Sequence, residues 1–179
     1  TLSLHDALPI LSMLLEYYAL RNNVIPPKFA TNGSACFDLH AHLAGVEIIK
    51  AYDTKNHSVI LEVKRNAVTI PPYHRAIINS GIIFDIPRGF SVRLHNRSGL
   101  SLKNGVKLVN QEAVIDHDYI EETMILIENT SELPFYLKNE DRICQGELVR
   151  NESIQVRETK RRPEDRNSGR NGGMGSTGA

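Results

Sequence analysis

The sequence lacks the features that identify several large classes of protein. It has only 2 cysteines, and Cys36 and Cys144 lie far apart and outside any metal-ligand spacing. A disulfide framework is therefore not expected, which fits a reducing cytoplasm. No apolar run is long enough to span a bilayer, and the apolar stretch 8–15 has neither the basic flank nor the cleavage site of a signal peptide.

The sequence also lacks an excess of charge of either sign. Its 21 basic and 21 acidic residues give a formal net charge of 0. This balance argues against a broad surface for nucleic acid or membrane, so neither is expected as a partner. A small cationic pocket for one phosphorylated ligand remains compatible with it. At 179 residues, the chain is long enough for one domain with a substantial core.

Helix signals are few, and strand signals dominate. Short segments rich in β-branched residues alternate with turn formers such as Ile86-Pro87-Arg88-Gly89. The expected strands are Val46–Lys50, Ser58–Val63, Arg75–Phe84, Phe90–Leu94, Met124–Asn129 and Ile143–Arg150. Only two short helices are expected, around Ser12–Leu20 and at Arg97–Lys103. This pattern predicts an all-β sandwich or barrel.

The two ends differ in character from the middle. Met13 begins a stretch typical of a domain start, so residues 1–12 are expected to be a non-native or disordered extension. The domain is expected to cover 13–157. From Glu158 the chain is charged and then rich in glycine and serine, which cannot bury enough apolar surface to order itself. Residues 158–179 are interpreted as a flexible arm, either a plain tail or one that orders over a ligand.

Arg97-Ser98-Gly99 is a candidate phosphate loop. Arginine supplies a planar fork of donors, serine a hydroxyl, and glycine lets the backbone come close to an anion. Taken alone, the segment could equally be an exposed loop with an incidental arginine.

The stretch Asn110–Tyr119 indicates a hairpin whose tip carries polar side chains. The Asn110 amide offers a donor and an acceptor to a pyrimidine edge, Tyr119 can pack beneath a sugar, and Asp116 can deprotonate a water. An ordinary surface hairpin is the alternative.

Two further segments could contact phosphate. Gln145 follows Asp141-Arg142 at the start of a predicted strand and could donate to a phosphate oxygen, unless it is only an exposed strand residue. The tail Gly172–Gly178, preceded by Arg170, offers glycine backbone and hydroxyls, although such a tail is more often a linker.

Together and in order, these segments resemble the five motifs of the homotrimeric dUTPase family, of the phage or bacterial type. Ala35–Ala41 is similar to A-G-[YF]-D-L-x-A, and Arg97–Gly105 to R-S-G-L-x-x-K-x-G. Asn110–Tyr119 resembles N-x-x-G-V-I-D-x-D-Y, and Asp141–Gln145 resembles D-R-I-[AC]-Q. The tail resembles R-G-x-G-G-F-G-S-T-G. Five motifs in one order are a far more specific signal than any single motif.

The resemblance implies a fold, a reaction and a set of roles. The fold is a distorted jelly roll, or β-clip, which forms a homotrimer with sites between subunits. The reaction is Mg²⁺-dependent hydrolysis of dUTP to dUMP and pyrophosphate by water attack at the α-phosphorus, which limits uracil in DNA and supplies dUMP for dTMP synthesis. Asp116 is the catalytic base, and Asp38 contacts the waters of the metal or, alternatively, caps a turn. The implied substrate-binding residues are Arg97, Ser98, Gly99, Asn110, Val114, Ile115, Asp116, Tyr119, Met124, Gln145, Arg170, Gly173, Met174, Gly175, Ser176 and Thr177.

The chain departs from the family pattern at several positions. Ala113, Glu121 and Glu140 stand where glycine is common, and Met174 replaces the aromatic residue expected over uracil. The stretch Gly45–Asn66 is longer than in most of the family and is interpreted as a lengthened hairpin of unassigned role.

Two other functions remain possible at this level. A dCTP deaminase shares the fold, but its pattern resembles R-S-S and I-D-x-G-[WY], unlike Arg97-Ser98-Gly99 and Asp116–Tyr119 here. A dUTP-binding regulator would be favoured by loss of Asp116 or of the tail, and both are present.

Overall fold

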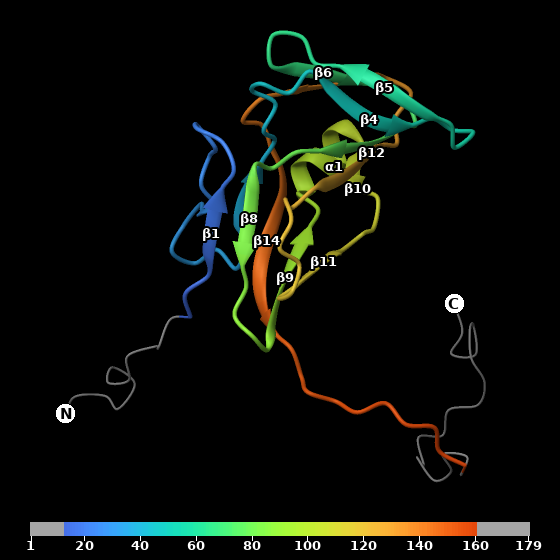
Figure 1. Cartoon of the computed structure of the whole chain (residues 1–179). Coiled ribbons are helices and arrows are strands. Elements are labelled where there is room, and N and C mark those ends of the chain that lie inside the picture. Colours follow the sequence, from blue (N-terminus) through green and yellow to red (C-terminus); the bar gives the residue numbers. More distant parts are fainter. Residues whose placement is uncertain (1–12, 161–179) are drawn as a thin grey trace, which may run out of the picture.

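The computed structural model describes residues 13–160, and nearly all of their regular structure is β (Figure 1). The elements are β1 (Glu16–Ala19), β2 (Lys28–Phe29), β3 (Phe37–His40), β4 (Ile48–Tyr52), β5 (Ser58–Glu62), β6 (Ala67–Ile70), β7 (Arg75–Ile78), β8 (Ile82–Asp85), β9 (Phe90–His95), α1 (Ser98–Asn104), β10 (Val106–Leu108), β11 (Ala113–Asp116), β12 (Ile125–Asn129), β13 (Phe135–Lys138) and β14 (Arg142–Arg150). The all-β class predicted from the sequence is confirmed. Within this range no helix has the length and apolar character needed to cross a membrane.

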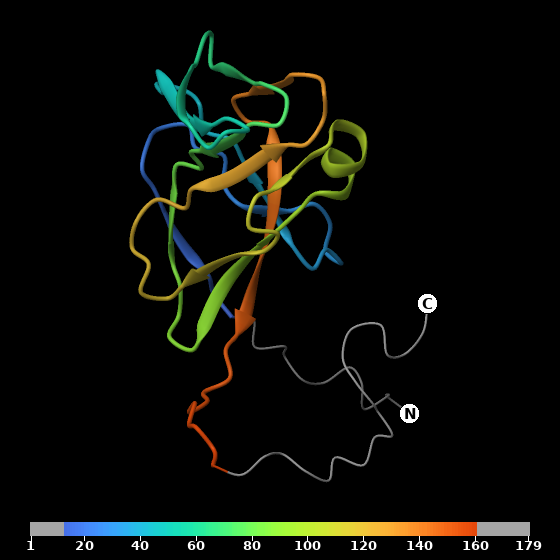
Figure 2. The same ribbon diagram turned by 90° about the vertical axis from the view of Figure 1, so that its right-hand side faces the viewer.

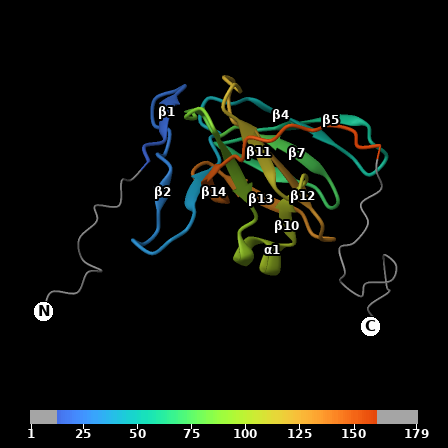
Figure 3. The same ribbon diagram turned by 90° about the horizontal axis from the view of Figure 1, so that it is seen from below.

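Two five-stranded antiparallel sheets enclose the core. Their orders are β10-β12-β7-β4-β5 and β11-β9-β14-β3-β2, and the pairs β1-β8 and β13-β6 flank them. In Figure 1, β4, β5 and β12 run across the view, whereas β8, β14 and β9 run down it. Buried side chains from both sheets form one apolar cluster, with Leu39 and Leu94 on one side and Ile49, Ile78 and Ile127 on the other. Figure 3 shows α1 at one edge, next to β10.

The long strand β14 is the centre of the second sheet because it pairs with β9 on one side and with β3 on the other. Successive side chains of a strand point to opposite faces. Phe37 and Leu39 of β3 are buried on the core face, so Asp38 between them points to the outer face. Gln145 lies opposite Asp38 and therefore shares that outer face.

A register shift in β14 changes which side chains reach the outer face. Arg142 lies opposite His40, but the next pairing is Cys144 with Leu39, so Ile143 is the extra residue of a β-bulge. Arg142 and Gln145 are three positions apart, so strict alternation would place them on opposite faces. The bulge turns both Ile143 and Cys144 into the core and brings Arg142 to the face that carries Asp38 and Gln145.

Three sequence expectations need correction. The helix expected around Ser12–Leu20 is wrong where the structure describes it, because Glu16–Ala19 pairs with Ile82–Asp85 as strand β1. The apolar stretch is too short for a stable isolated helix, and the edge of β8 supplies backbone partners instead. The single strand expected over Arg75–Phe84 is divided into β7 and β8 at Gly81, which has a positive φ of 73°.

The third correction concerns the hairpin at Asn110–Tyr119. Residues Ala113–Asp116 do not pair with the following strand, but with β9 of the other sheet. The hairpin strands are instead β10 and β12, with the stretch 109–124 as their long connection. The short helix expected at Arg97–Lys103 is confirmed as α1, and the segment 45–66 contains the expected hairpin, formed by β4 and β5.

Gly146 lies where neighbouring core side chains leave no room for a side chain, which gives a stability prediction. A Cβ atom at this position would lie 2.6 Å from Phe37 Cε2 and 3.2 Å from Leu94 Cδ2. We expect Gly146→Ala to lower the free energy of unfolding by about 1–3 kcal/mol, because the core must shift to accept the methyl group. Gly33→Ala is the matched control, since a Cβ there has no neighbour within 4 Å. Equal urea midpoints for the two variants would contradict the prediction.

Candidate functional site

A row of polar residues crosses four strands of the second sheet on its outer face. Lys28 lies opposite Asp38, Asp38 lies opposite Gln145, and Gln145 lies opposite His95. Directly opposed residues of an antiparallel ladder point to the same face, so these four side chains form neighbouring positions. The sheet therefore collects residues that are up to 117 positions apart in the sequence, from Lys28 to Gln145, on one surface.

Two arginines hold the carboxylate of Asp38. Arg97 Nε lies 3.3 Å from Oδ1, and Arg142 Nη1 lies 3.2 Å from Oδ2. Arg97 Nη1 also donates to the carbonyl oxygen of Arg142 at 3.1 Å, which ties the two chain segments together. Two guanidinium groups share one carboxylate here, so the cluster carries a net positive charge suited to a phosphate group.

A surface pocket opens beside this cluster. It is lined by Ile25, Pro26, Lys28, Phe29, Ala30, Asp38, His40 and Arg142. Burial lowers the pKa of the His40 imidazole, although the Asp38 carboxylate acts in the opposite direction. His40 is therefore mainly neutral at pH 7, and the positive charge of the pocket comes from Lys28 and Arg142, with Arg97 nearby.

The remaining predicted phosphate contacts lie next to Arg97. Ser98 and Gly99 begin α1, and both are exposed. The first N–H groups of a helix have no acceptor within the helix, so they are available to a ligand. The Gln145 side chain donates from Nε2 to the carbonyl oxygen of Asn96 at 3.0 Å, which fixes it beside the start of this loop. The structure thus brings together Arg97, Ser98, Gly99, Gln145 and Asp38. With Arg142 and Lys28, these residues form the phosphate cluster.

The predicted uracil and sugar contacts form a second group on the connection between β10 and β12. Asn110, Val114, Asp116 and Tyr119 are exposed, whereas Ile115 is buried and can offer a ligand only its backbone. Tyr119 is held in a turn, because its N–H donates to Asp116 O at 3.1 Å and its hydroxyl donates to Glu122 O at 2.9 Å. Met124 closes the loop, and its sulfur accepts a contact from Asn79 Nδ2 at 3.8 Å.

Within the chain, the predicted phosphate contacts and the predicted uracil and sugar contacts lie at opposite ends of β9. Asp116 pairs with Ser91 near the start of β9, whereas Gln145 pairs with His95 at its end. The four residue steps between Ser91 and His95 correspond to about 13 Å of extended strand, and Arg97 follows two residues later. A general base must lie within hydrogen-bond reach of its water. Asp116 therefore lies outside hydrogen-bond reach of the phosphate cluster formed by its own chain.

Sequence reasoning missed several residues of the phosphate cluster. Arg142 stood in a quoted motif without a role, because only the β-bulge shows which way its side chain points. Lys28 had no motif at all, and only its pairing with Asp38 places it at the pocket. The predicted contacts in the tail, namely Arg170, Gly173, Met174, Gly175, Ser176 and Thr177, lie outside the described residues.

Solved structures with a similar fold define the class of the protein. A mutant dUTPase of Staphylococcus bacteriophage 80alpha, solved with dUpNHpp, aligns with a TM-score of 0.73 at 17% identity and covers 94% of this chain and 100% of that chain. The dUTPase from Streptococcus mutans aligns with a TM-score of 0.62 at 19% identity, over 79% and 98% of the two chains. These likenesses show the fold, which is the distorted jelly roll, or β-clip, expected from the sequence.

Sequence comparison then gives the family. The family model described as dUTPase matches residues 47–178. The deoxyuridine 5′-triphosphate nucleotidohydrolase of Finegoldia magna is 35% identical over 158 residues, which covers 88% of this chain and 93% of the relative. The protein of the same name from Nautilia profundicola is 37% identical over 169 residues, covering 93% and 99%. The chain belongs to the dUTPase family.

Proposed function

We propose that this protein hydrolyses dUTP to dUMP and pyrophosphate. The observation that carries the proposal is the cationic cluster in which Arg97 and Arg142 share the carboxylate of Asp38, with Gln145 in the same row. Family membership and the names of the relatives support the same reaction. The family match also favours it over the dCTP deaminase and the regulator that the sequence alone left possible.

Binding of the phosphates and neutralisation of their charge are assigned to side chains that already form hydrogen bonds in the structure. Arg97 and Arg142 offer donors to phosphate oxygens, and each already donates to a backbone or carboxylate oxygen, which orients its guanidinium group. Ser98 and Gly99 add a hydroxyl and backbone N–H groups, and Gln145 adds an amide. Fixed donors of this kind stabilise the charge that develops on a transferred phosphoryl group without reorganising during the reaction.

On the nucleoside side, Asp116 is the proposed catalytic base and takes a proton from the attacking water. Asn110 and the backbone of Val114, Ile115 and Met124 are proposed to read the uracil edge. The ring of Tyr119 is proposed to pack under the deoxyribose, because its hydroxyl already donates to Glu122 O and the residue is 41% exposed. A ring fixed in this way can exclude a 2′-hydroxyl by contact.

Mg²⁺ is the proposed cofactor, and the residues present fit it only through water. Asp38 is the one acidic side chain in the row of opposed residues, and both of its oxygens contact arginine. Mg²⁺ commonly keeps several waters and is bound through substrate phosphates with one or two carboxylates, which agrees with an outer position for Asp38. When bound, the ion would neutralise phosphate charge, and the protein groups above would orient the triphosphate.

The proposal includes a homotrimer with sites shared between subunits. The span of β9 separates Asp116 from the phosphate cluster of its own subunit, so the base must come from a neighbour. After β14, residues 151–160 lead away from the strands in two perpendicular views (Figures 1 and 2). In that segment Ile154 is 77% exposed and Val156 is 93% exposed, as expected for a segment that packs on another subunit.

The proposed location is the cytoplasm of a bacterial cell or a phage-infected host. Both cysteines, Cys36 and Cys144, are free thiols in the structure, which agrees with a reducing compartment.

The first functional prediction tests the base. Asp116→Asn should lower kcat for dUTP by about 10²–10⁴-fold, because an amide cannot take a proton from water. KM should change little, since the amide still accepts a hydrogen bond. Pyrophosphate release, measured across the deoxynucleoside triphosphates, is the assay. Asp118→Asn is the matched control, as Asp118 is an exposed carboxylate in the same loop. Near-normal kcat in Asp116→Asn would exclude the assignment.

The second prediction tests sharing between subunits by complementation. Arg97→Ala and Asp116→Asn chains should each be nearly inactive, but trimers co-expressed from both should recover about a quarter of the normal activity, because one intact Arg97 and one intact Asp116 meet at a quarter of the sites. Light scattering should give three times the chain mass of 20.1 kDa. A monomer with full activity, or no recovery in mixed trimers, would refute the shared site.

The third prediction concerns the tail motif. Truncation before Arg170 should lower kcat strongly but change KM only slightly, because the proposed contacts of Ser176 and Thr177 with the phosphates act mainly on the chemical step. Met174→Phe should keep kcat or raise it modestly, since a flat ring covers a pyrimidine better than a thioether does. Steady-state kinetics of the unaltered protein, the truncation and Met174→Phe test this prediction. Full kcat without the tail would show that the tail is only a linker.

A further inference from the structure

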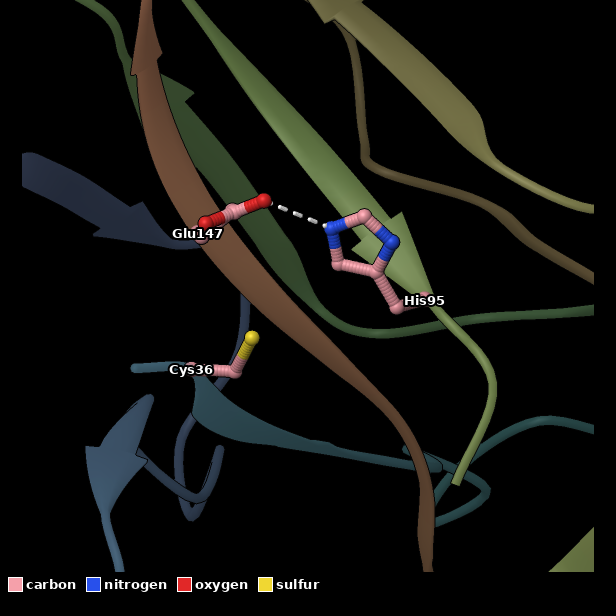
Figure 4. A group of neighbouring side chains, drawn as sticks. All are labelled: Cys36, His95 and Glu147. Carbon is pink, nitrogen blue, oxygen red and sulfur yellow. Dashed lines mark hydrogen bonds and ion pairs between the residues drawn. The ribbon is translucent and has the colours of Figure 1, made fainter. Parts of the chain in front are cut away.

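Three potential metal ligands meet on the outer face of the second sheet, beside the phosphate cluster. Cys36 directly precedes β3, Glu147 lies in β14, and His95 ends β9. Their ligand atoms all lie within 4.8 Å of one another, the one such group of at least three residues found in the described part of the chain. Figure 4 shows the Cys36 thiol and the Glu147 carboxylate directed to the same side of the sheet as the His95 imidazole.

The strand pairing explains why these residues meet. Gly146 lies opposite Phe37, so the next residue of β14, Glu147, is adjacent to Cys36. On the other side of β14, Gln145 lies opposite His95, so Glu147 is the diagonal neighbour of His95 on the same face. His95 and Glu147 thus come from adjacent strands whose backbones are fixed by their ladder, and Cys36 is the residue directly before the third strand, β3.

The spacing of the ligand atoms fits a small tetrahedral ion. With bonds of about 2.0–2.3 Å, the ligand atoms of a zinc ion lie about 3.3–3.7 Å apart. His95 Nε2 lies 2.9 Å from Glu147 Oε1, just below that value, and no pair of the three ligand atoms is separated by more than 4.8 Å. Small side-chain rotations therefore suffice to bring all three to bonding distance.

A second carboxylate supports the orientation of the histidine. His95 Nδ1 lies 3.6 Å from Glu112 Oε1, on the side of the ring away from Glu147. Glu112 is in turn within 3.5 Å of Arg93 Nη1. Metal-bound histidines usually donate their other ring N–H to a carboxylate, which fixes the tautomer and makes the ring a better ligand. At 3.6 Å, Glu112 is one small side-chain rotation away from such a hydrogen bond to His95.

We propose that Cys36, His95 and Glu147 bind one Zn²⁺ ion per chain. A thiolate, an imidazole and a carboxylate are a zinc set, whereas Mg²⁺ and Ca²⁺ take oxygen ligands only. The side chains of His95 and Glu147 are 29% and 38% exposed, so an ion can enter from solvent and keep a water as fourth ligand. The ion would join β3, β14 and β9 close to Asp38 and Gln145, and it would be separate from the Mg²⁺ of the reaction.

The test measures binding of Zn²⁺ itself. The full-length protein is freed of metal with a chelator, dialysed and titrated with Zn²⁺ against a chromophoric competitor. One equivalent per chain is expected, and it should raise the midpoint of thermal unfolding, because the ion binds the folded state alone. Co²⁺ in place of Zn²⁺ should give a thiolate-to-metal charge-transfer band in the near ultraviolet. Absence of stoichiometric binding would overturn the proposal.

Variants assign the ligands. Cys36→Ser should abolish the charge-transfer band, because the band comes from the thiolate, and should weaken Zn²⁺ binding. His95→Gln and Glu147→Gln should also weaken Zn²⁺ binding. Glu112→Gln should keep the band but weaken binding by about 10-fold, because it only orients His95. His57→Gln is the control, since His57 is an exposed histidine 3.1 Å from Asp53 in the turn between β4 and β5. Circular dichroism of each variant confirms folding. An unchanged Zn²⁺ affinity in folded Cys36→Ser would refute the site.

Discussion

The pairing of β14 with a strand on each side is the constraint on which the rest of this structure depends. The ladders to β3 and β9 leave so little space at Gly146 that Phe37 and Leu94 fill the volume a side chain would need. This close contact fixes the spacing of three strands, and their outer face holds Asp38, Arg142 and Gln145 of the phosphate cluster. Because the supporting face is a packed core, the charged face above it cannot shift easily.

The same constraint explains how a chain with no net charge presents a local excess of positive charge. Arg97 and Arg142 contact the carboxylate of Asp38, and Lys28 lies opposite Asp38 in the next strand, although the three basic residues are far apart in the sequence. A triphosphate would meet donors that are already oriented, so little side-chain freedom would be lost on binding.

Much of this picture could be predicted from the sequence, and the failures share one cause. The all-β class, most strands and the helix at Arg97 follow from local composition, and the ordered motifs indicate the family. Arg142 could not be placed because the bulge at Ile143 reverses the alternation expected for its strand. The group of Cys36, His95 and Glu147 was invisible because its members are distant in sequence and meet only through register. Register depends on the whole sheet, so local patterns do not determine it.

The position of the β4–β5 hairpin explains where this chain can vary in length. β5 is the last strand of its sheet. Neither strand of the hairpin carries a residue of the phosphate cluster or of the connection 109–124 with the proposed uracil contacts. One residue added to β9 would turn its outward side chains into the core, and two would move its ends apart by about 7 Å. We therefore expect insertions to be tolerated in the β4–β5 hairpin and not in β9. The length of β9 is constrained because it sets the distance between the two groups of proposed substrate contacts.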